Sequence, residues 1–165
     1  DNPQQPAQGA PPNKDPMSSI TLRFLAEPHT VNFGGKVHGG TVMKWIDEAG
    51  YACATRWAKR YCVTVSVGSI RFGRPIMIGD LVEVEARLAY TGRTSMNISV
   101  EVRAGDMKTG EMQVITECLV VFVAVDEGGK SLPVEAWLPE TPGELALAER
   151  VKAHLDAARA MSPTS

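Results

Sequence analysis

The stretch NFGGKVHGGTVMKWIDEAG, residues 32–50, places two glycine pairs, an asparagine, a histidine and a lysine directly ahead of an apolar run. A loop does not need four glycines in nine residues merely to reverse direction. Glycine has no Cβ, so it allows another group to come close to the backbone. This stretch therefore predicts a helix whose first residues leave their backbone accessible to another group.

The apolar run that follows predicts a helix over residues 41–59, about five turns long and apolar on most of its circumference. On a helical wheel the polar side chains share one narrow arc, occupied by Lys44, Glu48, Thr55 and Lys59. The apolar side carries Val42, Ile46, Ala49, Gly50, Cys53 and Trp57. Asp47 lies at the margin of the polar arc. Such a helix must be wrapped by the rest of the chain.

The wrapping is supplied by residues 62–125, which are strand-like almost throughout. Four apolar or alternating runs, at residues 62–72, 81–90, 94–104 and 112–125, are separated by short turns. Parallel neighbours would need crossovers of a dozen or more residues, so these strands must pair antiparallel. The alternation at residues 18–27 adds another strand. We therefore predict an α+β fold, a five-stranded antiparallel sheet around one long helix, with an edge strand covered by a partner subunit.

The two ends of the chain differ from this domain in composition and in the pattern of apolar residues. Residues 1–16 are rich in proline and glutamine and form a predicted tail that cannot join a core. Residues 17–138 make up the predicted domain. Residues 139–161 are expected to form a second, amphipathic helix, in which Thr141 is the N-cap and Glu144 completes a capping box.

Composition narrows the classes of function. The net charge is −2 with scattered cations, which argues against a general nucleic-acid binder. No apolar run approaches the ~20 residues of a membrane span, and no signal-peptide pattern is present, so we expect a soluble, cytoplasmic protein. Three cysteines without CxxC spacing indicate reduced core residues, with no disulfide and no metal site.

With these elements in hand, the chain resembles the hot-dog fold, and within it the acyl-CoA thioesterases of the brain-type acyl-CoA hydrolase group and their bacterial relatives. The resemblance covers residues 20–125 and is carried by Asn32, VHGGTVMKWIDEAG, RPIMIGDLVEVEARL and TGRTSMNISVEV. It implies hydrolysis of fatty acyl-CoA to a free acid and CoA, without a metal or cofactor. It also implies a homodimer or a higher multiple such as a hexamer, with the active site in the dimer interface.

The resemblance also assigns roles to individual residues. Asn32 and Asp47 match the catalytic positions, one approaching the substrate from each subunit, and the backbone at Gly39 and Gly40 lies where the thioester carbonyl is held. The predicted substrate-binding residues are His38, Gly39, Gly92, Arg93, Thr94 and Ser95, of which the last four match the segment that contacts CoA. For His38, a loop-packing or capping role is favoured over a catalytic one.

The residues suit this chemistry. Hydrolysis of a thioester needs an attacking water, a group that takes its proton, and donors for the oxygen that becomes negative. The first turn of a helix offers unpaired N–H donors with the positive end of the dipole behind them, so Gly40 and its neighbours predict an oxyanion hole. Asp47 is predicted to act either as general base or as a nucleophile that forms an anhydride.

Simpler roles compete for the same residues. A carboxylate on a helix is usually a solvated surface group, and an isolated asparagine is usually a turn residue, so Asp47 and Asn32 depend on the family match. Arg93 fits an ordinary hairpin turn as well as a phosphate site. Two other functions stay open. The first is a hot-dog hydratase, disfavoured because His38 precedes Asp47. The second is a non-catalytic acyl-CoA sensor.

Overall fold

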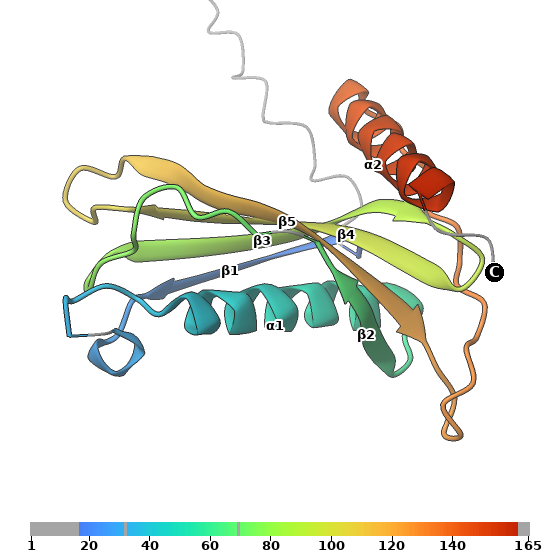
Figure 1. Ribbon diagram of the computed structural model, residues 1–165, viewed down its shortest axis with the longest axis horizontal. Helices are drawn as coiled ribbons and strands as arrows, with labels where there is room; N and C mark the ends of the chain where they lie inside the picture. Colours follow the sequence, from blue (N-terminus) through green and yellow to red (C-terminus); the bar gives the residue numbers. More distant parts are fainter. Residues whose placement is uncertain (1–16, 32, 69, 162–165) are drawn as a thin grey trace, which may run out of the picture.

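The computed structural model describes residues 17–31, 33–68 and 70–161 (Figure 1). In chain order the elements are β1 (Ser19–Leu25), a short 3-10 helix η1 (Pro28–Thr30), α1 (Gly39–Ala58), β2 (Cys62–Val67), β3 (Leu81–Thr91), β4 (Ser95–Gly105), β5 (Met112–Ala124) and α2 (Pro142–Met161). No helix among these residues is long and apolar enough to cross a bilayer.

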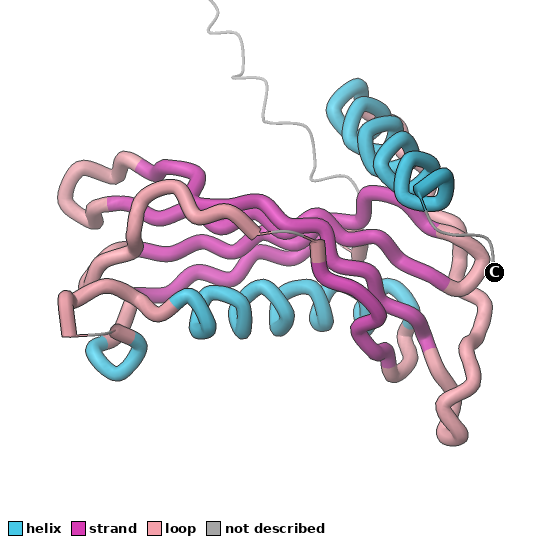
Figure 2. Tube along the Cα trace, viewed as in Figure 1, coloured by secondary structure: helices cyan, strands magenta, loops and turns pink. Residues whose placement is uncertain are grey.

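The five strands form one antiparallel sheet in the order β1-β3-β4-β5-β2. The long helix α1 lies along one face of this sheet, and α2 lies on the other face (Figures 1 and 2). β1 and β2 are the edge strands. The predicted fold class, a five-stranded antiparallel sheet around a long helix with a second helix at the C-terminus, is confirmed.

The core lies between α1 and the sheet. Ile46, Ala49 and Cys53 of the predicted apolar side are at most 1% exposed. Gly50 allows the closest approach, because a Cβ at this position would lie only 2.8 Å from the ring of Phe122 on β5. The absence of a side chain at Gly50 therefore fixes how near the helix lies to the sheet.

The strand predicted over residues 62–72 is shorter than expected and ends at Val67. A bulge between Thr64 and Ser66 shifts its register against β5. Beyond it the chain leaves the sheet edge, held by backbone N–H groups that Gly68 and Gly73 direct to carbonyls of β5. The alternation of apolar residues continues past this point, but the ladder does not, so the predicted boundary was wrong.

The predicted N-cap of the C-terminal helix, Thr141, is confirmed, and the helix begins at Pro142 rather than at residue 139. The Glu144 N–H donates to Oγ1 of Thr141 at 3.1 Å, and the Thr141 N–H donates to Oε2 of Glu144 at 3.4 Å, which is a capping box. Leu147 and Val151 are buried against Ala89 on the outer face of the sheet and form a second, smaller core. The predicted tail at residues 1–16 lies outside the described residues.

Candidate active site

The glycine-rich loop ends where α1 begins, and it leaves two backbone donors open. In the described part of the chain, the N–H groups of Gly39 and Gly40 make no hydrogen bond. Both residues are exposed, and a Cβ at Gly40 would have no atom within 4 Å. The positive end of the helix dipole lies behind these donors. The space beside Gly40 is therefore open to the oxygen of a bound carbonyl group.

His38 directly precedes these glycines and occupies the N-cap position. Its carbonyl accepts hydrogen bonds from the N–H groups of Thr41 at 3.0 Å and Val42 at 3.2 Å. Its imidazole is exposed and makes no capping hydrogen bond. His38 thus caps the helix through its main chain, and its side chain is exposed.

Asp47 lies on an exposed side of α1, next to the edge of the sheet. Oγ1 of Thr64, on β2, donates a 2.9 Å hydrogen bond to Oδ1 of Asp47. Our sequence analysis missed Thr64. Thr64 lies opposite Phe122 in the register of β2 and β5, but the strand CVTVSV carries a second hydroxyl at Ser66, so its sequence does not single out Thr64. The hydrogen bond fixes the carboxylate relative to the sheet edge.

Asp47 and the open donors do not meet within one chain. Asp47 follows Gly40 by seven residues on the same helix, a separation of about 10 Å along the axis at 1.5 Å per residue. Reacting atoms must lie roughly 3–3.5 Å apart. One thioester carbonyl therefore cannot contact both groups of a single chain. Asn32, the other predicted catalytic residue, lies outside the described residues.

The predicted CoA-contacting residues form the turn between β3 and β4. The Gly92 N–H donates to the Ser95 carbonyl at 2.9 Å, and a Cβ at Gly92 would lie 2.6 Å from Oγ of Ser95, so only glycine fits this tight turn. Arg93 is exposed. The turn lies at the end of the sheet where α1 finishes, and α1 begins, with Gly39 and Gly40, at the other end (Figure 1). Within one chain, the structure does not bring these groups together.

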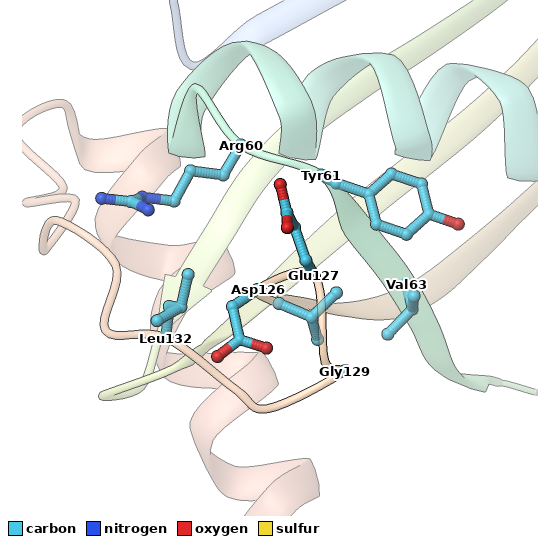
Figure 3. Close-up of a pocket in the computed structure, with 8 residues that line it drawn as sticks. Arg60, Tyr61, Val63, Asp126, Glu127, Gly129 and Leu132 are labelled. Atoms are coloured by element: carbon cyan, nitrogen blue, oxygen red, sulfur yellow. The ribbon is translucent and has the colours of Figure 1, made fainter.

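A hollow of about 620 Å³ opens at the C-terminal end of α1. Arg60 and Tyr61 lie on one side of it, and Asp126 and Leu132 lie on the other (Figure 3). Neither Gly40 nor Asp47, the two predicted catalytic residues with described positions, lines this hollow. Among the residues with described positions, no group of three or more His, Cys, Asp or Glu side chains could hold a metal ion.

The free edge of β2, with Tyr61 directly before it, carries apolar side chains that the single chain leaves in solvent. Tyr61, Val65 and Val67 are 63%, 55% and 47% exposed, and Tyr51 on the adjoining side of α1 is 39% exposed. The rings of Tyr51 and Tyr61 lie 6.3 Å apart in an edge-to-face arrangement. An apolar edge strand with unpaired backbone groups is a surface that a partner chain would cover. Asp47 and Thr64 lie beside this surface.

Comparison with known sequences identifies relatives over the same region. The Thioesterase superfamily model matches residues 34–111. The acyl-CoA thioester hydrolase YciA of Escherichia coli is 38% identical over 125 residues, which are 73% of this chain and 95% of that protein.

Solved structures agree with these sequence matches. A hexameric acyl-CoA thioesterase, solved without ligand, is 35% identical with a TM-score of 0.83, and the match covers 89% of this chain and 96% of the other. An acyl-CoA hydrolase of Staphylococcus aureus, solved with butyryl-CoA, CoA and CoA disulfide, is 28% identical with a TM-score of 0.81 over 87% and 88% of the two chains.

The S. aureus enzyme has also been solved with an asparagine, an aspartate or a threonine replaced by alanine. These three residues are separated by 15 and 17 positions, and Asn32, Asp47 and Thr64 have the same separations. The fold, the sequence identity over most of both chains and the family model agree. The chain belongs to the thioesterase superfamily, among the hot-dog acyl-CoA thioesterases.

Proposed function

We propose that the protein hydrolyses fatty acyl-CoA thioesters to free fatty acid and CoA, in a site built from two subunits. The observation that carries this proposal is the carboxylate of Asp47, held by Thr64 on the exposed side of α1 beside an apolar sheet edge. A solvated surface carboxylate would not need a hydroxyl on a neighbouring strand to orient it. The family to which the chain belongs supplies the reaction class.

The geometry of a single chain supports a site built from two subunits. A second copy that pairs its β2 with this β2 about a twofold axis extends the sheet antiparallel, and it sets the two α1 helices antiparallel to each other. The Asp47 of the partner subunit is then carried toward the N-terminal end of this α1, where Gly40 lies. Each dimer has two such sites. This arrangement removes the roughly 10 Å separation that prevents a single chain from acting alone.

The reaction uses the groups described above. The thioester carbonyl oxygen accepts hydrogen bonds from the N–H groups of Gly39 and Gly40, which stabilise the negative charge that develops on it. Water attacks the carbonyl carbon while Asp47 takes its proton, the C–S bond breaks, and the proton passes to the CoA sulfur. Direct attack by Asp47, through an anhydride that water then opens, gives the same products. Asn32 is proposed to orient the attacking group or the substrate.

The CoA portion is proposed to lie against the β3–β4 turn, where the guanidinium of Arg93 suits phosphate groups and Thr94 and Ser95 offer hydroxyls. Because this turn lies far from Gly40 in the same chain, it would serve a site on another subunit. Relatives solved as hexamers, including a broad-specificity acyl-CoA thioesterase and a Yersinia pestis thioesterase, support a homodimer that assembles further.

The proposed reaction requires no metal or cofactor, because a thioester is already an activated acyl group. Neither nucleic acid nor a membrane takes part in the proposed reaction. A location in the cytoplasm stays a prediction.

The test is release of free CoA thiol from a panel of acyl-CoA substrates, followed with a thiol reagent. Stoichiometric release of CoA and fatty acid is the expected result. Tight binding of acyl-CoA without release would instead identify a sensor. Loss of the enoyl absorbance of an enoyl-CoA without release of thiol would identify a hydratase.

A further inference from the structure

Phe72 lies against the first residue of α1. Its ring atoms Cε2 and Cζ are 3.6 and 3.7 Å from the position that a Cβ at Gly39 would occupy. The side chain is 46% exposed. The ring therefore borders the open N–H donors of Gly39 and Gly40 and presents a free apolar surface beside them.

The backbone around Phe72 is fixed by two glycines. The N–H groups of Gly68 and Gly73 donate to the carbonyls of Leu119 and Ile115 on β5 at 2.8 and 2.9 Å. A Cβ at either glycine would come within 3.2 or 3.3 Å of the same carbonyl oxygen. The segment can lie this close to β5 because both residues lack a side chain. Phe72 directly precedes the second of these anchors.

A second set of contacts joins this segment to the glycine-rich loop. Arg74 donates from Nη2 to the Ala104 carbonyl at 2.9 Å and from Nε to Oε1 of Gln113 at 2.8 Å. The N–H of Val37 donates to the carbonyl of Ile76 at 2.8 Å. These hydrogen bonds join the segment after Phe72 to the sheet and to the loop ahead of α1. They therefore hold the ring beside Gly39.

The neighbours of Phe72 show that the ring had an apolar core within reach. Ile70 packs against the main core, and Ile76 is only 2% exposed. Phe72 instead faces outward, where about half of its surface stays in water. One turn along α1 from Gly39, Met43 is 48% exposed, and Asp47 follows one turn further on the same side. Phe72 and Met43 are therefore two exposed apolar side chains near the first turns of α1.

We infer that Phe72 is the wall against which the first carbons of the acyl chain lie, so that it determines which acyl groups this enzyme accepts. The inference rests on the proposed function. The part of CoA next to the sulfur carries amides, which need polar partners when water is excluded. Phe72 and Met43 offer none, whereas methylene groups are favoured against such a surface.

The test compares Phe72→Ala and Phe72→Leu with wild-type protein on acetyl-, butyryl-, octanoyl- and palmitoyl-CoA. A matched control is Met107→Ala, which shortens another exposed apolar side chain, 57% exposed, in the turn between β4 and β5. For Phe72→Ala, the loss of kcat/KM should be smallest on acetyl-CoA, whose acyl group has no further methylenes. The value of kcat/KM should fall about 5- to 10-fold on butyryl-CoA, and this loss should then stay level for longer chains. The kcat/KM values of Phe72→Leu should lie between those of wild type and Phe72→Ala. Those of the Met107→Ala control should match wild type on all four substrates.

For a substrate with a branched acyl group, the change in activity should have the opposite sign. Removal of the ring opens space beside the carbonyl, so isobutyryl-CoA should gain relative to butyryl-CoA in Phe72→Ala. Thermal unfolding of each variant establishes that it is folded. An equal loss on every substrate, acetyl-CoA included, would show that the ring supports the fold or contacts CoA, and it would overturn the inference. So would unchanged kinetics on all substrates. A wild-type protein that releases no CoA from any substrate would instead overturn the proposed function.

Discussion

Thr64 on the edge strand β2 donates a 2.9 Å hydrogen bond to Asp47 on α1, which joins the two elements at the apolar edge of the sheet. Both residues are exposed in the single chain, so the contact is not a by-product of close packing in a core. It leaves the second carboxylate oxygen, Oδ2, for water or substrate. We interpret Thr64 as the residue that sets the orientation of the proposed catalytic carboxylate.

Removal of this hydroxyl should slow the reaction. Thr64→Val keeps the shape of the side chain but loses the donor, so kcat should fall roughly 10-fold because the carboxylate is no longer held in one orientation. Thr64→Ser retains the hydroxyl and should recover most of the activity. Steady-state kinetics of the three proteins on one acyl-CoA check this. Equal activity in Thr64→Val and wild type would mean that the hydrogen bond has no part in catalysis.

The edge of β2 should be the surface that forms the dimer. Val65→Lys places a charge on that edge, against the β2 strand of the proposed partner, so the dimer should dissociate and activity should be lost with it. Val114→Lys is the matched control, because Val114 is 57% exposed but lies on the interior strand β5. Light scattering measures both. A Val65→Lys protein that stays dimeric and active would place the interface elsewhere.

Alanine in place of two glycines of α1 should affect different properties: activity at Gly40 and stability at Gly50. Gly40→Ala places a Cβ where the chain itself has no atom within 4 Å, so the free energy of unfolding should change by less than about 0.5 kcal/mol. Its kcat/KM should nevertheless fall about 10-fold or more, because the methyl group occupies the space proposed for the thioester. Gly50→Ala meets the Phe122 ring at 2.8 Å and should lower stability by about 1–3 kcal/mol. Urea unfolding and kinetics separate the two effects.

The stability of the protein should decrease at alkaline pH through Cys53. Burial raises the pKa of this thiol from 9.0 to about 12, so the folded state keeps the proton that the unfolded state loses. The contribution of the protonated Cys53 thiol to the free energy of unfolding is complete below pH 9. It is lost as the pH rises toward 12, at up to about 1.4 kcal/mol per pH unit. Urea unfolding between pH 8 and 11 should show a steeper decline in wild type than in Cys53→Ala. Parallel declines would contradict this assignment.

Much of the fold was predictable because local patterns and packing agree. The apolar side of α1 places Ile46, Ala49 and Cys53 in the core, as the wheel predicted. The capping box of Thr141 and Glu144 forms as its spacing indicated. The three cysteines are free and buried, as expected from their spacing.

The site was less predictable, for physical reasons. Thr64 acts through a contact across 17 residues of chain, and nothing in its local sequence indicates that its partner is Asp47. The early end of β2 depends on a bulge and on backbone bonds to β5, which apolar alternation does not encode. The assignment of Asp47, Gly40 and Asn32 came from resemblance to a family, because each residue type alone favours an ordinary role.

The central claim is that Asp47 of one subunit acts on a thioester held by the other. Asp47→Asn keeps the size of the side chain and its ability to accept from Thr64 but removes its basicity, so kcat should fall about 100-fold or more. Binding of a non-hydrolysable acyl-CoA analogue should survive, because the phosphates and the acyl chain are held by other groups. Asn32→Ala should also lower kcat, through the opposite half of the same site.

The most direct measurement mixes these two inactive variants under conditions of subunit exchange and follows CoA release. A mixed dimer has one site in which both contributing residues are wild type, so activity should return, up to about half of the wild-type rate per mixed dimer, while each variant alone stays inactive. Light scattering before and after exchange establishes that dimers are present. No recovery in mixed dimers would contradict a site shared between subunits. Near-normal turnover by Asp47→Asn alone would show that Asp47 is a surface carboxylate and that the proposed mechanism is wrong.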